Sequence, residues 1–290
     1  MFTQVLLLGL VLGCIYGLIA LGYSLIYRAS GLMNFSQGDI LTIGAFLGYT
    51  FYGVMGLPFI VSFVLVIAIE VMLGMLIERG VIRRLLGGNA NAIYIVLATI
   101  AISYILQNGA MIAWGTKTQY FPSVFGIPRI NLFGVNIQPE AAFCIVVSFI
   151  IMIALHIFTK YTKYGTAMRA AAMDPLAAKA CGVNPSMTTA LTWGISAAIA
   201  GFGGMLIGPV YGVYTTLGST TGSNGYAGAV MAGFDNMYGA LLGGVLLGLI
   251  ETFVSSYVSS TYKDLVAYGL LLIFLYVKPT GIFNEKSLTE

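Results

Sequence analysis

The chain has 290 residues, of which 59% are hydrophobic and only 8% charged, and its 13 Lys and Arg against 10 Asp and Glu give a net charge of +3. A soluble domain carries roughly 25% charged residues, so this chain lacks the polar residues needed to cover a water-exposed surface. The composition excludes an ordinary soluble protein and predicts an integral membrane protein. Its spans must be helical, because lipid offers the backbone no hydrogen-bond partners.

The first half of the chain predicts five spans near the ~20 residues that cross a bilayer. They cover residues 4–27, 38–55, 58–77, 92–114 and 139–158. A polar break, RASGLMNFSQGD, separates the first two, and an aromatic loop at 115–138 precedes the fifth.

The second half begins with a polar island, Thr159 to Pro185, and continues with spans at about 186–208, 237–257 and 263–278. An uncharged stretch rich in Gly, Ser, Thr and Asn lies at 209–225, and a short segment follows at 225–235. The sequence therefore predicts an all-α integral membrane protein with about eight transmembrane helices and interrupted or re-entrant segments. Residues 1–290 would form a single transmembrane domain.

Basic residues indicate which loops face the cytoplasm, since short cytoplasmic loops are enriched in Lys and Arg. The loop at 78–91 carries Arg79, Arg83 and Arg84, and the island carries Lys160, Lys163, Arg169 and Lys179. Two spans separate these loops, so both can lie on the cytoplasmic side.

The breaks at 28–38 and 209–225 occupy similar places, because each ends a span and precedes a Gly-rich helix. Transporters often carry interrupted helices at matching positions of two halves, with the substrate path nearby. Small residues also recur four apart, which lets helices approach closely in lipid. Two interpretations stay open for these ridges: packing within one subunit, or contact with a second membrane subunit. The ridges are Gly9, Gly13 and Gly17; Ser196, Ala200, Gly204 and Gly208; and Ala240, Gly244 and Gly248.

The island contains signals for a short helix. Asp174 followed by Pro175 is typical of a helix start, and Gly182 suits the position after a helix that needs positive φ. A preceding helix from Gly165 to Met173 would present Arg169. The island is either a docking surface for a cytoplasmic protein or a basic loop that only sets the topology.

Residues typical of catalysis are scarce. The chain has one histidine, His156, and no GxxxxGK[ST] phosphate loop, so ATP hydrolysis would need another chain. The acids within or beside the spans are Asp39, Glu70, Asp235 and Glu251. Asp39 could cap the helix that follows it, and Glu70 and Glu251 could form structural hydrogen bonds or act in transport. A proton-coupled secondary transporter therefore remains an alternative.

Three motifs carry a family resemblance. The first lies in GLIALGYSLIYRASGLMNFSQGDILTIGAF, with an Asn-Phe-x-x-Gly-Asp core from Asn34 to Asp39. The second is the island, between Arg169-Ala170 and Gly182-Val183-Asn184. The third is the C-terminal run with Tyr262-Lys263-Asp264 and Pro279-Thr280-Gly281. In this order, and over almost the whole chain, they resemble the LivH-type permeases of high-affinity branched-chain amino acid ABC importers.

The resemblance implies a permease subunit, not itself an enzyme, in a bacterial or archaeal inner or plasma membrane. It implies a second, LivM-like permease, two cytoplasmic ATPases, an external solute-binding protein and an amino acid substrate. ATP and Mg would be bound by the ATPases and no cofactor by this chain; no nucleic acid is involved. The family has a Gly-rich turn where this chain has Asp235 and Asn236, so an importer for urea, an amide or another amino acid is an alternative.

Site residues follow from the two breaks and the island. The substrate path is expected to be lined by Asn34, Ser36, Gln37, Asp39, Thr220, Ser223 and Asn224. The island would form a cytoplasmic coupling helix that contacts the ATPases through Arg169, Asp174, Ala177, Ala178, Lys179 and Gly182. The binding protein is expected to dock on loop 115–138, with Tyr120, Phe121, Phe125 and Phe133.

Overall fold

The computed structural model describes residues 2–88, 91–126, 130–132, 135–234, 236–278 and 281. The α-helices in the described residues are α1 (Phe2–Ser30), α2 (Gln37–Gly48), α3 (Phe59–Ile77), α4 (Arg83–Gly87), α5 (Ala92–Trp114), α6 (Pro139–Tyr161), α7 (Lys163–Met173), α8 (Pro175–Ala180), α9 (Pro185–Tyr211), α10 (Leu217–Ala232), α11 (Met237–Tyr257) and α12 (Lys263–Val277). The π-helical segment η1 (Tyr49–Val54) extends α2, and a second, η2 (Glu78–Ile82), joins α3 to α4. A 3₁₀ turn, η3 (Ser260–Tyr262), precedes α12.

The predicted all-α class is confirmed, with one small addition. Strands β1 (Ile130–Leu132) and β2 (Val135–Ile137) form an antiparallel hairpin in the loop at 115–138, where the sequence analysis expected no strand. Seven helical stretches in the described part of the chain are long and apolar enough to cross a membrane. The expected span at 38–55 is the helix formed by α2 and η1. Most of α2 is buried inside the bundle, whereas no residue of η1 is buried.

The helices divide into a core and a periphery. Among the most apolar 18 residues of each helical stretch, 72% are buried within the protein in α1 and 83% in α9, but only 6% in the stretch that contains α12. Helices α1 and α9 therefore form the centre, and α2, α10 and α11 pack on them. The faces of α3, α5, α6 and α12 that point away from this centre are free to contact lipid.

Glycines set the closest helix contacts in the core. A Cβ at Gly17 would lie 3.1 Å from the carbonyl oxygen of Leu241, and one at Gly13 would lie 2.6 Å from that of Val245. On α9, a Cβ at Gly204 would lie 2.7 Å from the backbone nitrogen of Ala45. These ridges are thus occupied by helices of the same chain, as the first of the two interpretations predicts.

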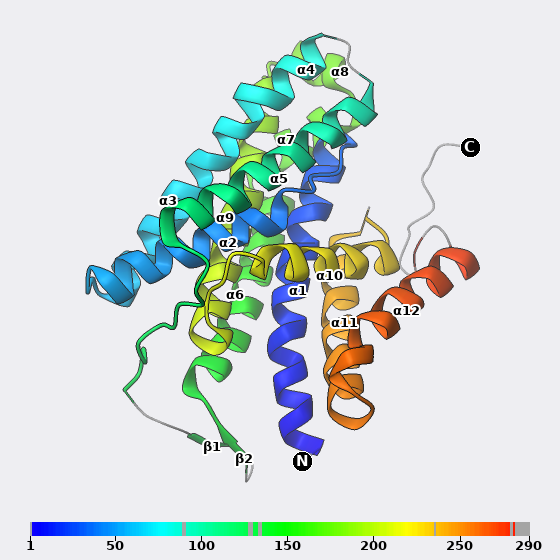
Figure 1. Ribbon diagram of the computed structural model, residues 1–290. Helices are drawn as coiled ribbons and strands as arrows, with labels where there is room; N and C mark the ends of the chain where they lie inside the picture. The colour runs from blue at the N-terminus through cyan, green and yellow to red at the C-terminus, as the bar shows by residue number, and fades with distance from the viewer. Residues whose placement is uncertain are drawn as a thin grey trace.

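The basic segments gather at one end of the bundle. Figure 1 shows α4, α7 and α8 together at the top, while the N-terminus and the β1–β2 hairpin lie at the bottom. Since Lys and Arg mark the cytoplasmic side, we assign the α8 end to the cytoplasm and the hairpin end to the outside. A Cβ at Gly281 would lie 2.5 Å from the α-carbon of Gly233, just after α10. The end of α12 therefore returns to the same side as the end of α10.

Candidate transport path and coupling surface

The two polar breaks meet in the interior of the bundle. The N-terminal parts of α2 and α10 cross where Gly38 faces Gly218 and Gly222, and a Cβ at Gly222 would lie 2.8 Å from the α-carbon of Gly38. The structure thus brings together the two segments that the sequence matched to each other.

The side chains of the first break are buried and hydrogen-bonded to one another and to neighbouring helices. Asn34 Oδ1 accepts hydrogen bonds from the Ser36 backbone N–H (3.1 Å) and hydroxyl (2.6 Å). Gln37 Nε2 donates to the carbonyl of Ser196 on α9 (2.9 Å), and the Ser196 hydroxyl lies 2.9 Å from the carbonyl of Gly22 on α1. These bonds join α1, α2 and α9, so Asn34, Ser36 and Gln37 form a joint within this chain.

Asp39 is also buried, in the first turn of α2. Its side chain makes no capping bond to the α2 backbone; instead one carboxylate oxygen accepts a hydrogen bond from the Ser103 hydroxyl on α5. The other oxygen has no hydrogen-bond partner in the described part of the chain. The capping role considered for Asp39 is therefore replaced by a link to α5.

The second break divides between two faces of α10. Thr220 and Ser223 lie on an exposed face, with Ser219 beside them, and their hydroxyls donate to carbonyls of the same helix. Asn224 points the other way and is buried: its Nδ2 donates to Glu251 Oε2 (3.0 Å) and to the Tyr16 hydroxyl (3.1 Å). Thr220, Ser223 and Asn224, which were expected to line the path together, therefore do not share one surface.

Glu251 forms the centre of a buried polar cluster. Its carboxylate accepts hydrogen bonds from the Tyr16 hydroxyl (2.8 Å) and Asn224, and an ion pair with Lys263 Nζ at 3.1 Å completes its partners. The cluster links α1, α10, α11 and α12. Because Glu251 is only 2% exposed and paired on both oxygens, the structural role left open by the sequence fits this acid.

Glu70 differs from Glu251. It lies at the junction of α2, α3 and α9, where the space beside Gly44 and Gly201 admits its side chain. It is fully buried, and neither carboxylate oxygen has a hydrogen-bond partner among the described residues. Asp235 lies outside the described residues, as do Phe133, Pro279 and Thr280 of the sequence motifs.

The island folds into two helices, α7 and α8, as predicted. Asp174 Oδ1 caps α8 by accepting hydrogen bonds from the N–H groups of Leu176 (2.8 Å) and Ala177 (3.0 Å). Gly182 has φ +82°, the left-handed conformation expected after the helix. Thr162, which the sequence analysis did not single out, caps α7 by accepting from Gly165 N–H (3.1 Å).

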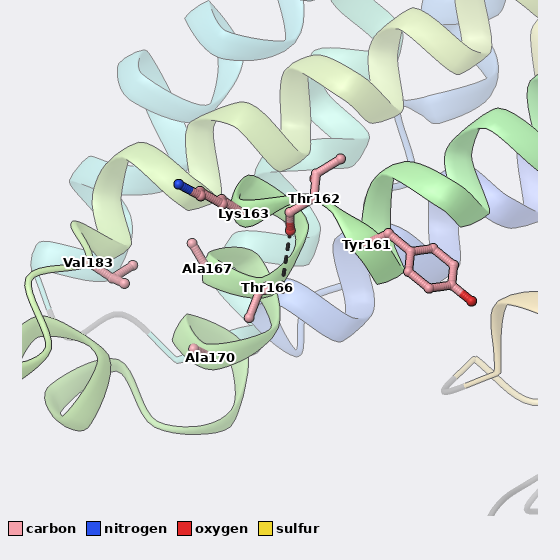
Figure 2. A pocket seen from close by; sticks show the side chains of 7 residues that line it. All are labelled: Tyr161, Thr162, Lys163, Thr166, Ala167, Ala170 and Val183. Atoms are coloured by element: carbon pink, nitrogen blue, oxygen red, sulfur yellow. Dashed lines mark hydrogen bonds between the residues drawn. The ribbon is translucent and has the colours of Figure 1, made fainter.

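The island also presents a defined surface. Arg169, Ala177 and Lys179 are exposed, whereas Ala178 is buried. Met173 and Leu176 are 89% and 81% exposed, a signal that the sequence analysis missed. A shallow hollow of about 350 Å³ lies on the island, and Figure 2 shows Ala167, Ala170 and Val183 around it. Exposed apolar side chains of this size are typical of surfaces that interact with another protein or with a membrane.

The described part of the outer loop is tied to its neighbours by several contacts, among them a backbone bridge. Gln119 and Val213 form an antiparallel bridge, which ties this loop to the segment between α9 and α10. Of the aromatic residues expected to meet a binding protein, Tyr120 and Phe125 are exposed, whereas Phe121 packs against Tyr49 and Tyr52.

Comparison with known proteins shows the family to which this chain is similar. The family described as "Branched-chain amino acid transport system / permease component" matches residues 5–275. The chain is 33% identical to the high-affinity branched-chain amino acid transport system permease protein LivH of Escherichia coli (strain K12), over 98% of this chain and 96% of that protein. It is 35% identical to the corresponding permease protein BraD of Pseudomonas aeruginosa, with the same coverage.

A more distant match is the permease protein LivM of Salmonella typhimurium, 24% identical over 92% of this chain and 67% of that protein. Among solved structures, one described as PsaBC from Streptococcus pneumoniae in complex with Fab shares the fold, with a TM-score of 0.50, 13% identity and coverage of 94% of this chain and 91% of that one. The family match over most of the chain, and relatives of about the same length, agree with the seven apolar helices in the described residues. The chain is a multi-pass membrane protein and belongs to the family of branched-chain amino acid transport system permease components.

Proposed function

We propose that this chain is one of two permease subunits of an ATP-driven importer that moves branched-chain amino acids into the cytoplasm. The observation that carries the proposal is the exposed hydroxyl face of α10, formed by Ser219, Thr220 and Ser223. It belongs to a helix packed on α1, α2 and α11 inside the bundle.

This face has the wrong chemistry for lipid tails. Polar residues within membrane proteins usually face the bundle interior or a water-filled cavity. A second permease subunit packed opposite α10 would cover this face and leave a hydrophilic path between the two chains. The relationship to proteins named LivH and to proteins named LivM supports a partner of the same fold.

Along this path the hydroxyls of Thr220 and Ser223 would form weak, transient hydrogen bonds with a passing zwitterion. Asn34, Ser36, Gln37 and Asp39 would support the path from behind. Gln37 and Asp39 already bind the neighbouring helices α9 and α5, and Asn34 and Ser36 bond to each other within the break. Asn224 would act in the same way through Glu251. Most of the binding energy would come from an external solute-binding protein docked on the outer loop around Tyr120 and Phe125.

At the cytoplasmic end, two ATPase subunits would dock on α7 and α8 of the permease pair. Arg169, Ala177 and Lys179 would contact them directly, together with Met173 and Leu176. Asp174 and Gly182 would fix the two ends of α8, and Ala178 would seat it on the bundle. ATP and Mg²⁺ would be bound by the ATPases and no cofactor by this chain. Closure of the ATPases would then rock the helix bundles and open the path from one side to the other.

The proposal is tested with the assembled transporter in proteoliposomes, measuring ATP-dependent uptake of labelled leucine. Ala177→Trp, which places an indole on the docking face, should abolish uptake and release the ATPases on affinity purification. Ala177→Ser is the matched control and should behave as the wild type. Leucine uptake by this chain alone, driven by a pH gradient without ATPases, would contradict the proposal. Urea or an amide transported in place of leucine would correct the substrate.

A further inference from the structure

Helix α9 begins at Pro185, directly after the turn that ends α8, and two basic residues near the end of α3 reach this start. Arg79 Nη2 lies 4.0 Å from Met187 Sδ, and Arg83 makes the shorter contacts. Arg83 lies between two partners. Its Nη2 donates a hydrogen bond of 2.6 Å to the carbonyl of Ser186 in the first turn of α9. The same guanidinium group donates from Nε to Glu78 Oε1 (3.1 Å) and from Nη2 to Glu78 Oε2 (2.8 Å).

The backbone between Glu78 and Arg83 explains how they meet. Residues five apart in an α-helix point about 140° away from each other, which would separate the two side chains. The π-helical segment η2 (Glu78–Ile82) changes this spacing, because its bonds join residues five apart. The irregular turn therefore places the carboxylate and the guanidinium on the same side, facing α9.

The pair is strong because of its burial and geometry. Glu78 is 2% exposed, so its charge needs a partner within the protein, and the two parallel bonds from Arg83 supply one. Arg83 is 38% exposed and keeps donor capacity for the Ser186 carbonyl. A lysine could not make this set of bonds, since its ammonium is a point charge without the planar fork.

Further along, α3 and α9 are in close contact. A Cβ at Gly74 would lie 2.5 Å from the carbonyl oxygen of Trp193, and a Cβ at Gly201 would lie 2.6 Å from Glu70 Cγ. A displacement of α9 along its axis would therefore move α3 as well, provided that the cytoplasmic ends of the two helices stay joined.

We propose that Arg83 is a positioning residue for energy coupling: by joining Glu78 to Ser186, it makes α3 follow α9 when the ATPases move α8. This inference rests on the proposed function, because it assumes an ATP-driven importer. It adds a residue outside the island to the coupling apparatus. Without the Arg83 bonds, α8 and the start of α9 could move while α3 stays behind, and ATP would be hydrolysed without opening the path.

The experiment uses the complete transporter in proteoliposomes, with both permeases, the ATPases and the binding protein. Labelled leucine taken up per ATP hydrolysed is measured for the wild type, Arg83→Ala, Arg83→Lys and Glu78→Gln. This ratio does not depend on how much protein is folded, so a purely structural role would not change it. Arg84→Ala is the matched control, because Arg84 is an exposed neighbour on the same short helix.

We expect Arg83→Ala to lower the uptake per ATP by about tenfold, which is within the range of fold-changes that typical coupling free energies between two sites produce. Arg83→Lys should lower it less, and Arg84→Ala should leave it unchanged. A wild-type ratio in Arg83→Ala would overturn the inference; if that variant does not assemble, a wild-type ratio in both Arg83→Lys and Glu78→Gln would do so. A wild-type transporter without ATP-dependent uptake would overturn the proposed function instead.

Discussion

The two polar breaks of this chain look alike in sequence and differ in structure. In the first break, Asn34, Ser36 and Gln37 are buried and bonded to their neighbours. In the second, Thr220 and Ser223 present their hydroxyls on an exposed face of α10. The comparison shows that a polar interruption of a membrane helix can serve as an internal joint or as a surface, according to where its neighbours lie.

The crossing of the breaks at Gly38 should be the most sensitive point. In Gly38→Val, a Cβ would lie 2.9 Å from the α-carbon of Gly222, and the added methyl groups would force α2 and α10 apart. We expect a loss of about 3 kcal/mol in the free energy of unfolding, at the upper end of overpacking effects. Thermal unfolding in detergent measures it.

The control for this crossing is Gly269→Val on α12, where a Cβ meets no atom within 4 Å. Its unfolding temperature should lie within about two degrees of that of the wild type, because substitutions at uncrowded surface positions change stability little. Equal destabilisation by both variants would show that the crossing is not a special contact.

Glu251→Gln tests the cluster behind the second break. The glutamine can still accept from Tyr16 and Asn224, but its amide nitrogen would face the ammonium of Lys263. We expect about 2 kcal/mol of destabilisation from the unmade bond, with leucine uptake per folded transporter unchanged. Asp264→Asn, at an exposed acid in the first turn of α12, is the control. Complete loss of uptake in well-folded Glu251→Gln would place this acid in the path.

Gln37→Leu tests the first break as a joint. The change removes the donor to the Ser196 carbonyl and should lower the free energy of unfolding by about 1.5 kcal/mol. The Ser196 hydroxyl also lies 3.1 Å from Gln37 Oε1, so Gln37→Leu and Ser196→Ala together should cost less than the sum of the two single changes. Simple additivity would contradict a shared joint.

Thr220→Val should have the smallest effect on stability, within about 0.5 kcal/mol, because the hydroxyl is exposed. It should nevertheless slow leucine uptake several-fold if this face lines the path. Thr221→Val is the matched control: the Thr221 hydroxyl is buried, and it donates to the Leu217 carbonyl at 2.6 Å. That variant should lose stability and keep its uptake rate. The reverse pattern would move the path to the other side of α10.

Features of this chain that depend on local chemistry could be predicted from the sequence. The long apolar runs gave the spans, and the cap at Asp174 and the turn at Gly182 were predicted because both depend on residues within one turn. The direction of Asn224, opposite to Thr220, could not be predicted, since it depends on which helices pack against α10. The link from Arg83 to Ser186 was missed for the same reason, together with the irregular turn in η2.

The pair of Glu251 and Lys263 has a consequence for how the chain is made. Glu251 lies in α11 and its lysine in the first turn of α12, which is synthesised after α11. Until α12 inserts, the carboxylate of Glu251 has no counter-charge, and an unpaired acid inside a membrane helix costs several kcal/mol. A chain that stops before Lys263 would therefore keep this cost.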